Sequence, residues 1–161
     1  MAALKYDLSK TGKVNLYALL TAAYGKGNVT DAQVTVSAPT TDTATEAGAN
    51  TKITLTAVAG NGVFKGDPID RFYSRVALGD ALTAIGKTTD DLKINGDVSA
   101  WKADGAAALA AINSLLGTVF VDGEITKANG ADSTNGDGKA VYTVDVGVIS
   151  THLGLTGALT F

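Results

Sequence analysis

The sequence contains no cysteine, and this absence excludes both a disulfide framework and a thiolate metal site. A single histidine, His152, leaves too few imidazole groups for a histidine-based metal site. Stability must therefore come from packing of the chain or from partner molecules. The cysteine count alone leaves open the redox compartment in which the protein works.

Aromatic and charged side chains are also scarce. Only ten residues are Phe, Tyr or Trp, so the core has to be built from many small contacts among Ala, Val, Leu and Ile. Asp, Glu, Lys and Arg make up 18% of the chain, and the net charge is −3. Clusters of Lys or Arg in the sequence contain no more than two such residues. Because nucleic-acid binding depends on clustered basic side chains, we expect no nucleic-acid partner.

Long apolar runs are missing as well. No stretch approaches the roughly 18 apolar residues that a membrane-spanning helix requires, so we expect no membrane partner. The N-terminal sequence MAALKYDLSKTGK lacks the basic segment and the apolar run of a signal peptide. These features predict a protein that is made in the cytoplasm and stays there unless it is assembled into a particle.

The residues that are present suffice for a globular fold. A chain of 161 residues, 45% of them apolar, can form one compact domain over 1–161 or two intimately packed modules, 1–79 and 80–161. Nineteen glycines and abundant threonine favour strands and turns.

Two segments have the apolar periodicity of amphipathic helices. In VNLYALLTAAY, the apolar residues at 16, 19, 20, 23 and 24 predict a helix over about 13–24, with Thr11 as its cap and Gly25 as its stop. In DGAAALAAINSLLG, a second helix is predicted over about 104–117, with Asp104 near its start and Gly117 at its end. Its apolar stripe consists of Leu109, Ile112, Leu115 and Leu116. Short helices are expected between these two, near 80–85 and 90–94.

Period-two alternation predicts several strands. AQVTVSA and TKITLTAVA are predicted to pair, and a soft loop through the 40s joins them. RFYSRVAL predicts a third strand, with Phe72 or Tyr73 on one face together with Val76 and Leu78. Further strand candidates are TVFVDGEI, AVYTVDVGVI and LGLTGALTF. We therefore predict an α+β fold in which one or more antiparallel sheets pack against the two helices.

The segment ALTAIGKT, Ala81–Thr88, fits the loose phosphate-loop pattern that ends in Gly-Lys-Thr. A phosphate loop follows a buried strand and is rich in glycine, so that its amides can converge on phosphates. Here Leu, Thr, Ala and Ile fill the variable positions, and two acidic residues and an Asn-Gly turn follow where a helix should begin. A small nucleotide-binding enzyme that uses this segment, with Lys87, is a remote alternative.

Other catalytic patterns are weaker still. The glycines at 60, 62 and 66 in GNGVFKG are too widely spaced for a dinucleotide fingerprint and predict a turn. His152 would have to anchor any Ser-His-Asp triad, but Ser133 and Ser150 lie in no nucleophile-elbow context. We interpret His152 as a polar residue at a strand end.

Two acidic pairs, Asp90 with Asp91 and Asp122 with Glu124, could in principle serve as acid and base. Glycosidases draw their two carboxylates from separate elements that line an aromatic-rich cleft, so these neighbours are interpreted as solvated turn residues. The sequence therefore predicts a protein that is not an enzyme, with no catalytic, cofactor-binding or metal-binding residues.

The loop over 128–139 contains a partial calcium motif. Ser133, Asn135, Asp137 and Gly138 copy the spacing of EF-hand ligands 1, 3 and 5 and of its glycine. The bidentate acid is missing, because the twelfth position is Val144 and Asp145 lies one place off. We interpret the loop as a hairpin connection in which Asn135-Gly136 or Asp137-Gly138 supplies the residues with positive φ. Whether Asp132 and Asp137 bind an ion weakly is left open.

The first half of the chain resembles a known module. The segments LSKTGKVNLYALLTAAYG, VTVSAPT, NTKITLTAVAGNGVFKGD and RFYSRVAL are similar to a module in virion structural proteins of large tailed bacteriophages. In that module a helix of the type TGK-x-N-L-x-x-L-x-x-A-x-G precedes a sheet of strands like TKITLTA. LAAINSLLGTVFVDGEI looks like another element that is common in such proteins.

The resemblance implies a non-enzymatic structural component of a virion, present in many copies as a capsid decoration, head or tail-surface protein. Its partners would be capsid or tail subunits and other copies of itself. Head, tail tube, tail surface and fibre are not distinguished by these motifs, and neither are symmetry or host. A soluble binding module, adhesin-like or carbohydrate-binding, is the alternative.

Overall fold

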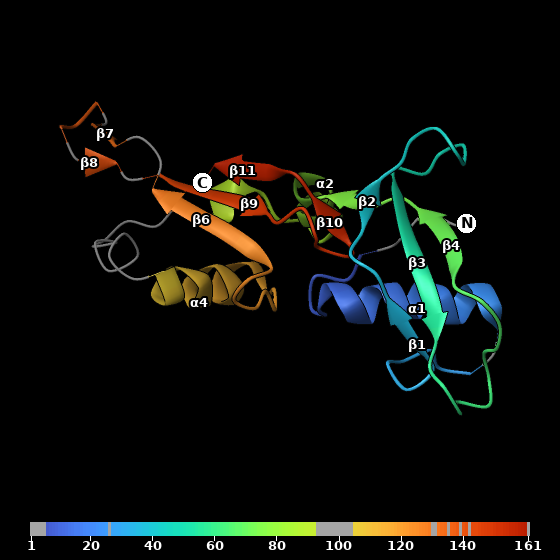
Figure 1. Cartoon of the computed structure of the whole chain (residues 1–161). Coiled ribbons are helices and arrows are strands. Elements are labelled where there is room, and N and C mark those ends of the chain that lie inside the picture. The colour runs from blue at the N-terminus through green and yellow to red at the C-terminus, as the bar shows by residue number, and fades with distance from the viewer. Residues whose placement is uncertain are drawn as a thin grey trace. The chain divides into compact units, whose positions relative to one another are not determined.

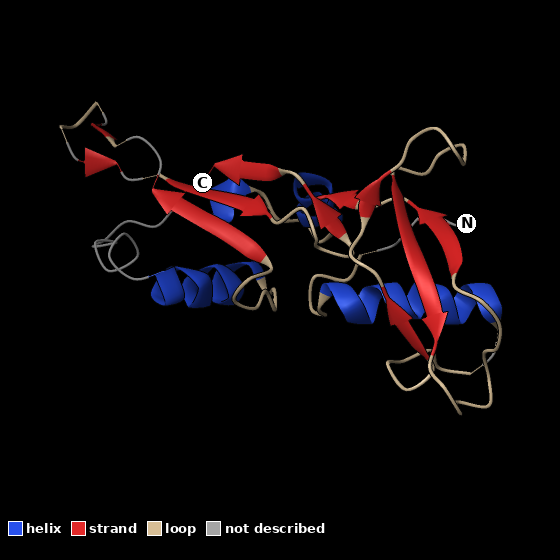
Figure 2. Ribbon diagram, in the orientation of Figure 1, coloured by secondary structure: helices blue, strands red, loops and turns tan. Residues whose placement is uncertain are grey.

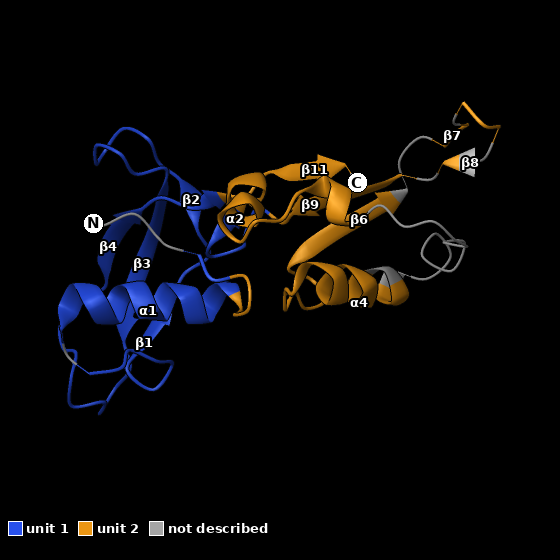
Figure 3. Cartoon of the chain, turned by 180° about the vertical axis from the view of Figure 1, so that it is seen from behind, with its two compact units in different colours: residues 1–7, 12–76, 150–155 blue, residues 8–11, 77–149, 156–161 orange. Residues whose placement is uncertain are grey.

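The structure is a computed structural model of the chain, and it describes residues 6–25, 27–92, 105–129, 132–134, 136–138, 140–141 and 143–160. It confirms the predicted α+β class, with helices and antiparallel sheets (Figures 1 and 2). The chain forms two compact units (Figure 3). Unit 1 comprises residues 1–7, 12–76 and 150–155, and unit 2 comprises residues 8–11, 77–149 and 156–161.

Unit 1 is a helix packed on a four-stranded sheet. Helix α1, Gly12–Tyr24, lies across one face of the sheet, as Figure 2 shows. The strands are β1 (Val34–Val36), β2 (Thr40–Thr41), β3 (Thr51–Ala57) and β4 (Ile69–Tyr73). All pairs are antiparallel and all include β3. Val36 of β1 lies opposite Leu55 of β3, and Arg71 of β4 lies opposite Ile53 of β3. The predicted pairing of AQVTVSA with TKITLTAVA is therefore confirmed.

The core of unit 1 forms where α1 faces the sheet. Leu16 and Leu20 of the predicted helical stripe are fully buried, whereas Leu19 is only partly buried. The side chains opposite them come from alternate positions of the strands, as a period-two pattern requires. The buried cluster consists of Leu16, Tyr17, Leu20, Val29, Val34, Ile53, Leu55 and Tyr73.

The third predicted strand is shorter than expected. Strand β4 ends at Tyr73, which is buried, whereas Phe72 is only partly buried. The side chain of Asn50 binds the main chain of Arg75 and so replaces the ladder hydrogen bonds beyond β4. Val76–Ala77 forms a separate strand, β5, and Leu78 begins helix α2 instead of lying on a strand face. Strand β5 pairs with β10 (Leu155–Thr156), and in both the chain passes from one unit to the other.

Unit 2 contains a three-stranded antiparallel sheet with β9 at its centre. The helices among its described residues are α2 (Leu78–Ala84), the 3₁₀ turn η1 (Thr89–Leu92) and α4 (Gly105–Leu116). Its sheet strands are β6 (Ile125–Asn129), β9 (Val144–Val148) and β11 (Ala158–Thr160), and β7 (Ser133–Thr134) and β8 (Ala140–Val141) form a small separate hairpin. Ile112 and Leu116 of the predicted α4 stripe are buried, while Leu109 and Leu115 are partly buried. Asp104 and Ile94, which bounded predicted helices, lie outside the described residues.

Strand boundaries in unit 2 differ from the prediction. TVFVDGEI is not a strand before Ile125, and β6 instead runs on through Asn129 into the segment expected to be loop. The reason is that the Asn113 side chain, not a neighbouring strand, binds the main chain of Phe120. LGLTGALTF is divided into β10 and β11 at Gly157, whose φ of 90° interrupts an extended chain. AVYTVDVGVI is likewise divided into β8 and β9. In the described part of the chain, no helix has both the length and the apolar character needed to span a membrane.

Candidate functional site

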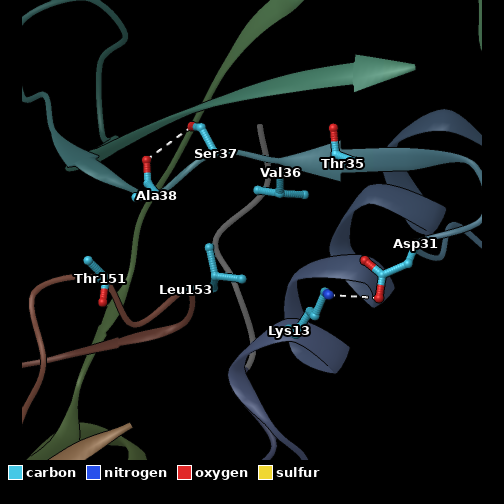
Figure 4. A pocket seen from close by; sticks show the side chains of 8 residues that line it. All are labelled: Lys13, Asp31, Thr35, Val36, Ser37, Ala38, Thr151 and Leu153. Carbon is cyan, nitrogen blue, oxygen red and sulfur yellow. Dashed lines mark hydrogen bonds and ion pairs between the residues drawn. The ribbon is translucent and has the colours of Figure 1, made fainter. Parts of the chain in front are cut away.

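Unit 1 carries a surface groove of about 350 Å³. Its walls come from the start of α1, the loop before β1, strand β1 with the residues after it, and the segment 150–155. In Figure 4, the apolar side chains of Val36 and Leu153 lie between an ion pair at one end and Ala38 and Thr151 at the other. The lining residues are Lys13, Asp31, Thr35, Val36, Ser37, Ala38, Thr151 and Leu153.

The ion pair joins Lys13 to Asp31, with 2.7 Å between Nζ and Oδ2. The Tyr17 hydroxyl donates a hydrogen bond to the other carboxylate oxygen, and the Lys13 ammonium lies 5.9 Å from the centre of the Tyr17 ring. The hydrogen bonds from Lys13 and Tyr17 hold the pKa of Asp31 below its ordinary value. Burial, followed by the hydrogen bond to Asp31 and its charge, raises the pKa of Tyr17. The groove therefore presents a carboxylate and an ammonium, and the buried phenol of Tyr17 supports the carboxylate from behind.

Strand β1 contributes its open edge to the groove. The Ser37 amide donates to the Thr54 carbonyl, and the Val58 amide donates to the Gln33 carbonyl. Because alternate residues of an antiparallel strand face the partner strand, the main-chain groups of Val36 point away from β3. The Ser37 hydroxyl is already engaged, since it accepts from the Thr54 amide at 2.9 Å and donates to the Ala38 carbonyl at 3.0 Å. Of the three hydroxyl groups among the lining residues, those of Thr35 and Ser37 already hydrogen bond to β3.

His152 lies beside this groove and is buried, with 3% of its surface exposed. Its Nδ1 accepts hydrogen bonds from the amides of Gly154 (3.0 Å) and Leu155 (2.9 Å). We therefore assign the neutral tautomer with the proton on Nε2, which lies 3.4 Å from the Tyr6 hydroxyl. A Cβ at Gly12 would stand 2.7 Å from the ring, so His152 fills the space that this glycine leaves. The role of the ring is to shape the turn before β10.

Arg75 fastens the segment 150–155 to the sheet of unit 1. Its Nη1 donates to the carbonyls of Ser150 (2.7 Å) and His152 (3.2 Å), and its Nε donates to Thr51 Oγ1 at 3.0 Å. The Tyr73 hydroxyl donates to the Leu153 carbonyl at 2.5 Å. The sequence does not point to Arg75, because two of its partners are main-chain carbonyls and the third is a threonine hydroxyl, and none of these leaves a pattern in a sequence.

Asparagine side chains make a repeated type of contact that we term an asparagine clamp. In each clamp, Oδ1 accepts from the amide of one residue and Nδ2 donates to the carbonyl of the same residue. Four clamps occur among the described residues, and they join Asn15 to Asp7, Asn50 to Arg75, Asn61 to Phe64, and Asn113 to Phe120. Each pins an irregular segment that has no strand beside it at that point. An asparagine inside an apolar pattern, as in VNLY and AINS, is the one weak sequence signal for them.

The Ala81–Thr88 segment does not have the geometry of a phosphate loop. Its first four residues belong to α2. The amides of Ile85, Gly86 and Lys87 donate to carbonyls at the end of that helix, at 2.9 to 3.0 Å, and Gly86 has a φ of 71°. These amides close the helix C-terminus and are not directed at an anion. The Lys87 ammonium lies 3.2 Å from Asp91.

The acidic candidates lie in turns. Asp91 accepts a hydrogen bond from the Thr88 amide at 2.7 Å, and this bond, followed by the one from Lys87, lowers its pKa. Glu124 accepts from the Val121 amide at 3.2 Å, and Asp122 is exposed. Ser150 lies in the segment bound by Arg75, on a different unit from Ser133. The glycines at 60, 62 and 66 all have positive φ, which confirms the predicted turn.

The chain between β6 and β9, which are antiparallel neighbours, is the predicted hairpin connection. It begins after Asn129 rather than at 128, and it contains the small β7–β8 hairpin, in which Ser133 lies. Gly138 supplies the positive φ, at 75°, and Asn135 lies outside the described residues. Asp132 and Asp137 are exposed. Within the described residues, no three His, Asp or Glu side chains gather closely enough to hold a metal ion.

Comparison with known proteins places the chain in a family but assigns no activity. Neither the curated proteins nor the solved structures contain a match to this chain. One family model matches residues 5–161, which is nearly the whole sequence. The chain therefore belongs to that family, described as "Family of unknown function (DUF7941)".

Proposed function

We propose that this protein is a non-enzymatic structural component of a tailed-phage virion, present in many copies as a capsid decoration, head or tail-surface protein. The observation that carries the proposal is the structural role of the residues behind the resemblance to virion proteins. The motif segments TGKVNLYALLTAAYG and TKITLTA and the first part of RFYSRVAL come together as α1, β3 and β4 of unit 1.

The motif residues carry packing roles rather than chemical ones. Gly12 makes room for His152, and Asn15 clamps Asp7 through two hydrogen bonds, of 2.7 and 2.9 Å. Leu16 is fully buried in the cluster that also holds Ile53 and Leu55 of the TKITLTA strand. A sequence pattern made of such residues reports a shared scaffold, and the step from that scaffold to a structural role in an assembly is made by analogy with the virion proteins.

The surface of each unit offers contacts to neighbouring subunits. Among the described strands, β4 pairs with β3 alone and β6 pairs with β9 alone, so each has an open edge. Open edges attract further strands unless a neighbour covers them. Several large apolar side chains are also exposed, namely Val63 and Ile69 in unit 1 and Val119, Val121 and Val141 in unit 2. Repeated subunits cover such surfaces through symmetric contacts.

The test is to isolate a virion whose genome encodes this chain and to determine the copy number of each of its proteins by quantitative mass spectrometry. We expect the protein in many copies per particle, and electron microscopy of the particle should show it on the head or tail surface. Light scattering of the purified protein should show ordered oligomers or binding to particles. A strictly monomeric protein that is absent from virions and binds none would overturn the proposal.

The groove of unit 1 favours a second candidate, a soluble binding module. Lys13 and Asp31 offer one ion pair to a ligand, and the open edge of β1 offers main-chain hydrogen bonds. A glycan array probed with the purified protein tests this candidate. Binding that is lost on Lys13→Ala and kept on Lys127→Ala, a substitution in unit 2, would favour it over a purely structural role.

A further inference from the structure

The Asn61 clamp contains an Asn-Gly pair, Asn61-Gly62, and such pairs are prone to deamidation. Asn61 precedes Gly62 in the turn between β3 and β4, and Gly62 has a φ of 74°. Asn61 Oδ1 accepts from the amides of Val63 and Phe64, both at 2.7 Å. Its Nδ2 donates to the Phe64 carbonyl at 3.0 Å and to the Val58 carbonyl. The carboxamide is therefore held by four hydrogen bonds.

An asparagine followed by glycine is chemically labile, because glycine has no side chain to hinder its amide nitrogen. That nitrogen attacks Cγ of the asparagine, a new N–C bond forms, and the Cγ–Nδ2 bond breaks with release of ammonia. Water then opens the cyclic imide to aspartate or isoaspartate, so no oxidant or further reactant is needed. For Asn61, this attack requires the carboxamide to turn away from Val63 and Phe64 and to give up its hydrogen bonds.

We infer that Asn61 is a deamidation site that the folded turn protects, so that aspartate or isoaspartate at this position marks chains whose 58–64 turn has opened. The rate at Asn61 in the native protein then equals the rate in an open chain multiplied by the fraction of time that the turn is open. The inference does not depend on the proposed virion role.

Modification would prevent the turn from closing again. A carboxylate has no donor, so its oxygens would face the carbonyls of Val58 and Phe64 in place of the Nδ2 amide. Isoaspartate also lengthens the main chain. The Phe64 main chain would lose its hydrogen bonds to Asn61, which place the Phe64 ring with its centre 5.3 Å from that of Tyr24 at the end of α1. Deamidation is therefore an irreversible opening of this edge of unit 1.

The experiment compares the full chain in native buffer and in denaturant, both mildly alkaline and incubated side by side. Proteolytic peptides are analysed by mass spectrometry for deamidation at each Asn-Gly pair. The four pairs begin at Asn61, Asn95, Asn129 and Asn135. In denaturant we expect similar rates at all four pairs. In native buffer we expect deamidation at Asn61 to be at least about tenfold slower than in denaturant. Equal native and denatured rates at Asn61 would overturn the inference.

A matched pair of variants tests the hydrogen bonds that hold the carboxamide. Val63→Pro removes one of the two amides that donate to Asn61 Oδ1, whereas Val63→Ala keeps it, and the Val63 side chain is 46% exposed. Val63→Pro should raise native deamidation at Asn61 toward the denatured rate, and Val63→Ala should leave it unchanged. The same rate in both variants would contradict protection by the clamp. If Val63→Pro does not fold, the comparison of native and denatured wild-type protein still decides.

Discussion

At the scale of single residues, asparagine side chains fix irregular segments that the apolar cores do not hold. With ten aromatic residues and no disulfides, the chain has few ways to fix irregular segments. A clamp presents an acceptor and a donor to the main chain of one residue, as an adjacent strand would. Asn15 is the most deeply buried of the four, with 4% of its surface exposed, and it holds the segment that enters α1.

We expect Asn15→Asp to lower the free energy of unfolding by about 1–3 kcal/mol. The substitution keeps the shape but replaces the Nδ2 donor by an oxygen that faces the Asp7 carbonyl. Chemical denaturation monitored by circular dichroism would measure the loss. Asn28→Asp is the matched control, because Asn28 is exposed, and it should change stability far less. Equal losses in the two variants would show that the clamp adds little.

The buried phenol of Tyr73 predicts a loss of stability in alkali. Burial raises the pKa of Tyr73, and the charge of Arg75 offsets the rise only in part. The unfolded chain titrates near the ordinary value of 10.0, so stability is fully present below that pH and declines as the pH rises above it. Tyr73→Phe should flatten this decline and should lower stability at neutral pH by about 1 kcal/mol, because the bond to Leu153 is lost. Denaturation curves across this pH range would test both effects, and an unchanged alkaline decline would contradict the assignment.

At the scale of elements, replacing a glycine by alanine is expected to have opposite effects on stability in helices α1 and α2. Gly12 in α1 and Gly79 in α2 both lie near helix starts, where alanine has the better helix propensity, by up to about 1 kcal/mol. A Cβ at Gly12 would stand 2.7 Å from His152, whereas at Gly79 its nearest contact would be Leu159, at an ordinary 3.6 Å.

We therefore expect Gly12→Ala to destabilise the protein by about 1–3 kcal/mol and Gly79→Ala to be neutral or mildly stabilising. Thermal unfolding of the two variants would measure both effects. The cost of Gly12→Ala should shrink in a His152→Ala background, because the two sites share one contact. Strict additivity of the two substitutions would refute the steric explanation.

The helices and the central strands were predictable because periodicity identifies them. The α1 and α4 stripes and the alternation of β3 placed Leu16, Ile112 and Ile53 in the cores. Phe120 was misassigned to a strand, because the partner of its main chain is the side chain of Asn113, and an apolar pattern does not specify what an extended segment binds.

The candidate groove was not predictable from the sequence. Its walls come from residues near 13, 31–38 and 151–153, which only the return of the chain to unit 1 brings together. None of these segments carries a motif, and their side chains are of ordinary types. By contrast, the motifs that did attract attention, Ala81–Thr88 and the 128–139 loop, are a helix with its C-terminal cap and a hairpin connection. Spacing alone could not separate these structures from binding loops.

At the scale of the whole molecule, the two units are interleaved along the chain. After the β9 strand of unit 2, residues 150–155 return to complete unit 1, and residues 156–161 then add β11 to the sheet of unit 2. Unit 1 consequently depends on a segment that lies far from it in sequence. Arg75 and Tyr73 bind that segment through the carbonyls of Ser150, His152 and Leu153.

Two truncations separate these dependencies. Removal of 150–161 should expose the amides of β3 to hydrogen exchange, because Tyr73 and Arg75 lose their carbonyl partners in that segment and the buried Leu155 is absent. Removal of 156–161 alone should leave β3 protected and should speed exchange in β9, which loses its β11 neighbour. Hydrogen exchange read by mass spectrometry resolves the two strands within one sample. If the β3 amides stay equally protected after both truncations, residues 150–155 are dispensable for unit 1. If the protection of the β3 amides is lost in both truncations, the segment 156–161 is needed for more than the sheet of unit 2.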